Sequence, residues 1–233
     1  MVTYHDKEYQ LTKLIKQGKS NIDSKFQPLA DWINQTYDVQ TMNVIYDIIN
    51  PDKRPRLQII FEFGKDKVKF LNSNFNFDSE KQQAIADQFI KSLQTQGLIK
   101  KESILSFLTK ETMEYKTDDL LVVFSAFEPI ARDEANESVP IEQIQKLKEQ
   151  IANKDIWEIK NSFSAAIFFF YTEVQVESNS KNGVKEELSQ RYYDLLKQYD
   201  EFDYFKRVDY SVLLDSKENF DNKYQSNWFY YSR

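Results

Sequence analysis

A chain of 233 residues, of which 41% are hydrophobic and 15% aromatic, can fold around its own core without covalent staples. The sequence contains no cysteine, which excludes disulfides and thiolate metal sites and favours a reducing compartment. The formal net charge of -6 disfavours nucleic-acid binding and suits either plain solubility, which is the simpler interpretation, or a basic protein partner.

The first half of the chain alternates between helical and strand-like hydrophobic periods. Pro51 and Pro55 place a turn between its first two strands, because each proline fixes φ and withholds a backbone donor. Gly97 is expected to end its longest helix. In chain order we expect helices over 9–18 and 26–36, strands over 42–49, 56–63 and 67–71, a helix over 79–95, a short helix within 99–112, a strand over 119–124 and a short helix over 126–135.

The second half contains the most apolar run of the sequence, residues 164–171. Its aromatic content predicts a strand buried on both faces, and it is too short to cross a bilayer, which takes about 20 apolar residues as a helix. Alternation over residues 173–177 predicts a strand with one solvent-facing side. The other expected elements are a helix over 140–152, a strand at 156–159, a helix over 184–199, a strand over 205–214, one helical turn at 217–222 and a final strand over 228–231.

Both halves show the same expected order of helix, strand, strand, helix, strand and short helix. A shift of 90 residues also aligns residues 115–131 with residues 205–221 without a gap. Identical residues then meet at the positions of Lys116, Asp119, Val122 and Glu128, although the repeated order of elements is the stronger argument. We therefore expect a tandem duplication of one unit.

The expected fold class is α+β, with antiparallel sheets covered by helices. Residues 1–23 are expected to form an N-terminal arm, residues 24–137 a first repeat and residues 138–233 a second repeat. The polar stretch 133–139 is the expected boundary between the repeats. Residues 1–7 lack the apolar region of a signal peptide, so we expect a cytoplasmic protein without a membrane partner.

Side chains that commonly carry catalysis are scarce. His5 is the only histidine and lies in a polar N-terminal stretch, which makes a Ser–His or Cys–His mechanism improbable. The four glycines are far apart, so the sequence has no phosphate-binding loop. We expect no catalytic residues and no cofactor, and hence a protein that is not an enzyme.

Carboxylates remain as candidate ligands. Asp200, Glu201 and Asp203 could bind a hard cation, but without the EF-hand pattern a solvated turn is the simpler interpretation, and no metal site is expected. Glu128 and Glu218 could act as acid and base only if they lay within about 5–10 Å of one another. The simpler interpretation is that each satisfies the first turn of its short helix.

Several segments of the second half occur in a recognisable order. They are a helix leading to Ile156-Trp157, the aromatic run 167–171, a helix containing Tyr192-Tyr193-Asp194-Leu195-Leu196, residues 205–210, the acidic stretch 215–221 and a closing Trp228-Phe229-Tyr230. In this order the region from residue 140 to residue 231 resembles the YezG-like family of bacterial toxin-immunity proteins. The resemblance implies a non-catalytic protein that binds and blocks a cognate toxin in the cytoplasm, and the acidic net charge suits a basic toxin domain as that partner.

A binding protein of this kind would use an acidic and aromatic surface, because aromatic side chains are frequent interface anchors. The candidate contact residues are Asp200, Glu201, Asp203, Asp209, Glu218 and Trp228. For Trp228 and the tyrosines beside it, an edge strand packed onto the sheet is the simpler interpretation. The alternative functions are a carboxylate- or metal-dependent hydrolase and a structural scaffold with no ligand.

Overall fold

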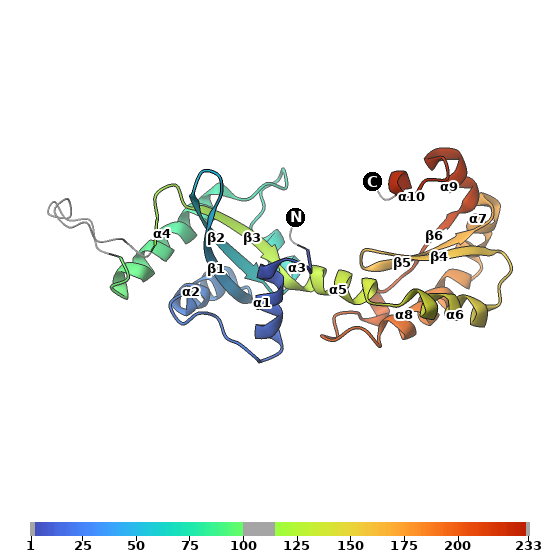
Figure 1. The fold of residues 1–233 in the computed structure, drawn as a ribbon, viewed down its shortest axis with the longest axis horizontal. Coiled ribbons are helices and arrows are strands. Elements are labelled where there is room, and N and C mark those ends of the chain that lie inside the picture. The colour runs from blue at the N-terminus through green and yellow to red at the C-terminus, as the bar shows by residue number, and fades with distance from the viewer. Residues whose placement is uncertain (1–2, 100–114, 232–233) are drawn as a thin grey trace. The chain divides into compact units, whose positions relative to one another are not determined.

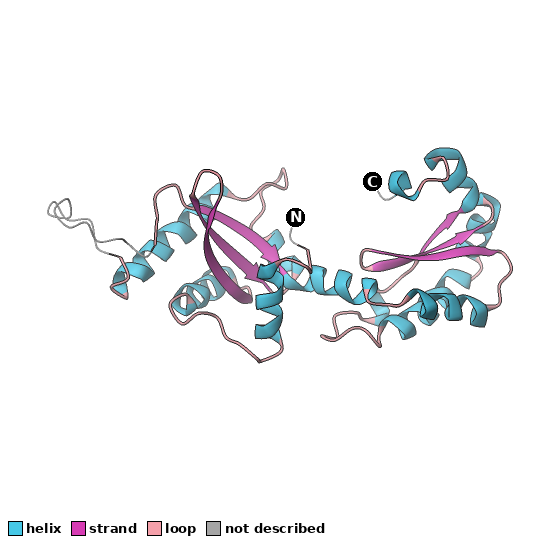
Figure 2. Ribbon diagram, in the orientation of Figure 1, coloured by secondary structure: helices cyan, strands magenta, loops and turns pink. Residues whose placement is uncertain are grey.

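The computed structural model describes residues 3–99 and 115–231 of the chain. Two compact units can be distinguished, the first ending at Ile130 and the second beginning at Ala131. Within these described residues each unit holds a three-stranded sheet with helices packed against it, which confirms the expected α+β class (Figures 1 and 2). Among the described helices, none is both long enough and apolar enough to span a bilayer.

The first unit has a mixed sheet in the order β1-β2-β3. Strands β1 and β2 are antiparallel neighbours, whereas β3 lies parallel to β2, so the expected all-antiparallel sheet is corrected. A parallel neighbour requires a crossover, and the described part of this one contains α3 and α4. The elements in chain order are α1 (Lys7–Lys16), α2 (Gln27–Tyr37), β1 (Thr41–Ile49), β2 (Arg54–Phe61), α3 (Gly64–Val68), α4 (Ser79–Thr95), β3 (Leu121–Ala126) and α5 (Phe127–Glu137), which continues into the second unit.

The second unit repeats this pairing in the order β4-β5-β6, with β4 and β5 antiparallel and β5 and β6 parallel. Figure 1 shows α6 and α8 on one face of this sheet and α9 and α10 on the other. The elements in chain order are α6 (Ile141–Ile151), β4 (Ile156–Ser162), β5 (Ala165–Phe170), α7 (Glu173–Lys181), α8 (Val184–Leu196), the 3-10 turn η2 (Arg207–Asp209), β6 (Leu213–Ser216), α9 (Lys217–Tyr224) and α10 (Trp228–Tyr231).

The two parallel ladders end in the same way. Phe61 faces Ala126 in the last pair of the first ladder, and Phe170 faces Ser216 in the last pair of the second. Helix α5 begins at the residue after the first ladder, and α9 begins at the residue after the second. The shift of 90 residues therefore aligns the two strand-to-helix connections. The repeated order of elements is therefore present in the structure, while common descent of the two units stays a prediction.

One face of each sheet forms an apolar core with the long helices. In β2, alternate residues Leu57, Ile59 and Phe61 are buried with residues of α2 and α4. In β5, Phe168 and Phe170 are buried with residues of α6 and α8. Because side chains alternate along a strand, the residues between these ones point to the opposite face of each sheet.

Two expected strands are not formed. Residues 173–177 belong to α7, because Thr172 and Gln175 form a capping box that starts a helix there. Residues 67–71 lie largely in and after α3, where Val68 is exposed and only Phe70 enters the core. In both segments a short alternation of polar and apolar residues was the only feature that predicted a strand. The capping box starts a helix in the first segment, and in the second only Phe70 reaches the core.

Two further strand predictions were wrong in extent or type. Of the expected strand over 205–214 only its end is a strand, in β6. The expected strand over 228–231 is helix α10, since Trp228 and Tyr231, three residues apart, both pack on Phe169. The short helix expected within 99–112 lies almost wholly outside the described residues.

Helix α1 packs onto the first unit, so the separate arm expected over residues 1–23 is corrected. Tyr9 is buried and stacks on Phe127 with ring centroids 4.9 Å apart. The side chain of Asn43 in β1 donates to the Thr12 hydroxyl at 3.1 Å. A buried tyrosine and a buried polar pair are contacts that a mobile arm would lack.

The expected boundary at 133–139 lies in α5 and the turn after it, and is not a flexible linker. Asn136 is 0% exposed. Its side-chain amide donates to the carbonyls of Phe163 and Ala165 at 2.5 and 2.7 Å, and its Oδ1 accepts from the Tyr192 hydroxyl at 2.9 Å. The end of α5 is thereby fixed to the hairpin and to α8 of the second unit.

Replacing Asn136 by alanine should destabilise the second unit by about 3 kcal/mol, because the buried Tyr192 hydroxyl and two carbonyls lose their partner. Urea unfolding measures the change. As a matched control, Asn222→Ala on the exposed side of α9 should change stability by less than about 0.5 kcal/mol. Equal effects of the two substitutions would contradict the anchoring role of Asn136.

Candidate functional site: the C-terminal aromatic helix

Helix α10 is held to the second unit by its first and last residues. The Trp228 ring stacks on Trp157 at 5.9 Å and on Phe220 at 4.1 Å between centroids. The Tyr231 ring lies 5.3 Å from that of Phe169, and its hydroxyl donates to the Asp215 carboxylate at 2.5 Å. A one-turn helix has little stability of its own, so these contacts fix its position.

The middle residues of α10 point away from the sheet. Phe229 is 61% exposed and Tyr230 48% exposed, and their ring centroids are 5.9 Å apart. Aromatic side chains exposed side by side on an anchored segment lose little conformational entropy on binding and are enriched at protein interfaces. This pair, Phe229 and Tyr230, is called the exposed aromatic pair below.

Charged groups surround the anchoring rings. The Lys160 ammonium lies 4.1 Å from the Trp228 ring centroid, and the Lys217 ammonium lies 5.4 Å from that of Trp157. Burial, together with the hydrogen bond to the Asp215 carboxylate, raises the pKa of Tyr231. A phenol is protonated at neutral pH, and this one donates its hydrogen bond to Asp215 and so ties α10 to β6.

Asp200 and Asp203, which were predicted to contact a partner, stabilise the turn that follows α8. The Asp200 side chain is 3% exposed and accepts hydrogen bonds from the backbone N–H groups of Tyr204 and Phe205 and from Lys197. Asp203 is exposed and pairs with Lys197 and Lys206. The solvated-turn interpretation thus describes Asp203, while Asp200 is a buried turn residue that no partner can touch.

The six predicted contact residues do not form one surface. Exposed Glu201 follows α8 and exposed Asp209 lies in η2, whereas Glu218 and Trp228 belong to α9 and α10 on the opposite face of the sheet. Trp228 points inward as an anchor. Sequence reasoning missed Phe229, although the spacing of Trp228 and Tyr231 by three residues was a signal for a helical turn that exposes the residues between them.

Glu128 and Glu218 occupy matching places in their own units. The Glu128 carboxylate accepts from the Gly64 N–H at 3.2 Å, and the Glu218 carboxylate accepts from the Glu173 N–H at 3.1 Å. Each carboxylate thus accepts from the first residue of the helix that follows the second strand of its unit, α3 or α7. This arrangement supports a structural role at a helix N-terminus.

In the described part of the chain, no three His, Asp or Glu side chains gather in a way that could hold a metal ion. Comparison with family models, with curated proteins and with solved structures finds no match to this chain. The candidate site therefore rests on its geometry.

The ion pairs of Asp203 in the turn after α8 can be tested by thermal unfolding at acid pH. Hydrogen bonds from Lys197 and Lys206 lower the pKa of Asp203 to about 2, below its ordinary value of 3.8. A carboxylate with a lowered folded-state pKa stabilises the fold above its ordinary pKa, and this contribution is lost as the pH falls towards the folded-state value. The melting temperature of Asp203→Asn should therefore fall less steeply than that of the wild type between pH 4 and pH 2.

The matched control for this titration is Asp209→Asn, a nearby exposed carboxylate for which the structure gives no ion pair. Its melting temperature should follow the wild-type acid profile. Parallel profiles of wild type and Asp203→Asn would show that the lysine pairs do not hold Asp203 ionised.

Proposed function

We propose that this protein is a non-catalytic interaction protein that binds another protein through α10, in the manner of an immunity protein that blocks a toxin. The observation that carries the proposal is the exposed aromatic pair on a helix whose neighbouring residues are locked onto the sheet. Two large rings already held in place can enter pockets of a partner without first being ordered. The loss of water from both rings supplies the main favourable term.

Charge supports a basic partner. Most of the net negative charge of the chain falls after residue 130, in the second unit. Exposed Glu218 lies on α9, the helix that packs against α10. The net negative charge of the second unit would attract a basic domain and increase its association rate at low salt.

The resemblance of residues 140–231 to the YezG-like immunity family covers this same unit, and it supplies the class of partner in the proposal. A toxin domain is a partner whose activity can be blocked by occupying its surface. Blocking requires only that the inhibitor binds tightly, and the inhibitor itself catalyses no reaction.

The test is co-expression of the chain with products of neighbouring coding regions, with growth of the host as the readout. The wild-type chain should restore growth against its cognate toxin and form a complex with it. In the double variant Phe229→Ala/Tyr230→Ala, affinity measured by calorimetry should fall by about 100-fold or more, because each anchor truncation typically costs at least a factor of ten. The melting temperature should stay within a degree or two, since both rings are exposed.

A matched control is Phe163→Ala, which removes another phenylalanine, 69% exposed, at the turn between β4 and β5. It should leave affinity unchanged. The α10 surface would be refuted if the double variant bound as well as the wild type. The immunity role would be refuted if no co-expressed product arrested growth in a way that the chain relieves.

A further inference from the structure

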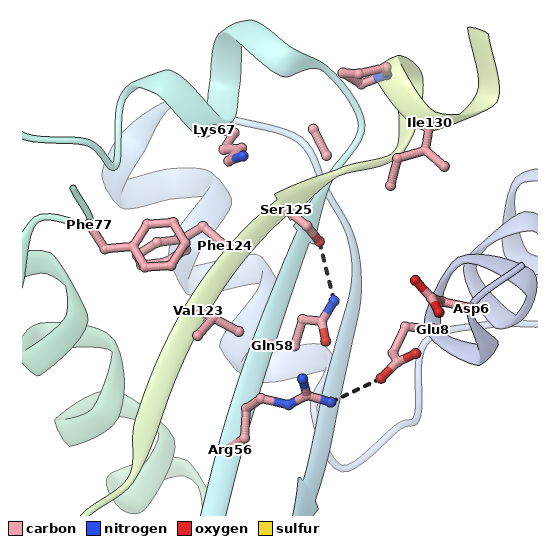
Figure 3. Close-up of a pocket in the computed structure, with 12 residues that line it drawn as sticks. Asp6, Glu8, Arg56, Gln58, Lys67, Phe77, Val123, Phe124, Ser125 and Ile130 are labelled. Carbon is pink, nitrogen blue, oxygen red and sulfur yellow. Dashed lines mark hydrogen bonds and ion pairs between the residues drawn. The ribbon is translucent and has the colours of Figure 1, made fainter. Parts of the chain in front are cut away.

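A hollow of about 500 Å³ lies along strands β2 and β3 of the first sheet and reaches around β3 to Phe124 of the apolar core and to Phe77, which packs against that core (Figure 3). Strands β2 and β3 form its floor, and α1, α3 and α5 supply its walls, all within the first unit. The volume falls in the range of known ligand sites, about 300–1,000 Å³. Its lining combines apolar Phe77, Val123 and Ile130 with polar Gln58 and Ser125.

Gln58, on the floor of this hollow, is an incompletely satisfied buried amide. The residue is 2% exposed. Its Nε2 donates to the Ser125 hydroxyl over a long 3.4 Å, and its Oε1 accepts no hydrogen bond within the described residues. A buried acceptor without a donor costs stability, so its presence in a folded protein calls for a reason.

The second unit provides an internal comparison for this position. Gln58 faces Val123 three residues before the end of the first parallel ladder, and Ile167 faces Leu213 three residues before the end of the second. The fold therefore accepts an isoleucine where the first unit carries glutamine. The amide is not required to build this sheet, which points to use by a ligand.

The second unit also shows what kind of molecule can cover this face. There the corresponding face, marked by Phe169, is covered by a polypeptide segment of the chain itself, α9 and α10. In the first unit α1 covers part of the face and leaves the hollow beside it. A polypeptide segment from a partner is thus the occupant that the architecture favours.

We infer that the hollow binds a peptide segment of a partner protein, whose backbone amide pairs with the Gln58 carboxamide while an apolar side chain packs against Phe77, Val123 and Ile130. The ligand N–H donates to Gln58 Oε1, and Gln58 Nε2 turns from its long contact with Ser125 to the ligand carbonyl. Glu8, which pairs with Arg56 at 2.9 Å at the edge of the hollow, moves aside to admit the segment. The site is separate from α10 and does not depend on the function proposed there.

The test is a ¹⁵N NMR titration of the full chain with N-acetyl-leucine methylamide as the probe. Saturable shifts are expected for the Gln58 side-chain amide and for the backbone of β3 from Val123 to Ala126. N-acetyl-leucine dimethylamide keeps both carbonyls but lacks the terminal N–H, so it should bind about 5-fold more weakly. This pair of probes tests the wild-type chain and needs no variant to fold.

The variant Gln58→Ile transfers the residue found at the matching place in the second unit. It should raise the melting temperature, because the unsatisfied amide is removed, and it should abolish the response to the probe. The inference is overturned if the methylamide gives no saturable shift, if both probes bind equally, or if Gln58→Ile keeps the response. An ordered water on Gln58 in a protein that ignores the probe would likewise overturn it.

Discussion

A three-stranded sheet has two faces, and an apolar side chain on either face must be shielded from water by another element of the fold. In the second unit this constraint centres on Phe169, which points away from the core formed by Phe168 and Phe170. The rings of Phe220, Trp228 and Tyr231 cover it. Because these rings come from α9 and α10, covering one buried phenylalanine fixes the position of α10, and it leaves the side chains between the anchors facing solvent.

The first unit meets the same constraint with different chemistry. Its second face carries Arg56 and Gln58, which need hydrogen-bond partners as well as cover. Arg56 finds them in Asp47, directly opposite on β1, and in Glu8 of α1. Gln58 is only partly satisfied, and the hollow lies above it. One architecture thus produces an aromatic surface in one unit and a polar hollow in the other.

The sequence was sufficient for the elements whose periodicity is long. The helices α2, α4, α6 and α8 and the strands β1, β3 and β5 lie near their expected positions, because apolar spacing over many residues leaves few alternatives. Short segments were decided by other forces: capping by Thr172 turned an alternating stretch into α7, and packing on Phe169 turned the last residues into α10. Trp228 was expected at a partner surface and points inward, since side-chain direction depends on the tertiary neighbour. Neither the burial of Asp200 nor the unsatisfied amide of Gln58 leaves any mark in the sequence pattern.

The central claim is that α10 is a fixed part of the second unit, and amide hydrogen exchange of the isolated chain tests it most directly. The N–H groups of Tyr230 and Tyr231 donate to the Asn227 carbonyl, and the half-buried rings of Trp228 and Tyr231 anchor the helix on buried Phe220 and Phe169. The account predicts exchange at these two amides slowed by about 100-fold or more relative to an unstructured chain. Exchange at the rate of an unstructured chain would contradict it, because the exposed aromatic pair would then not be held in a fixed position.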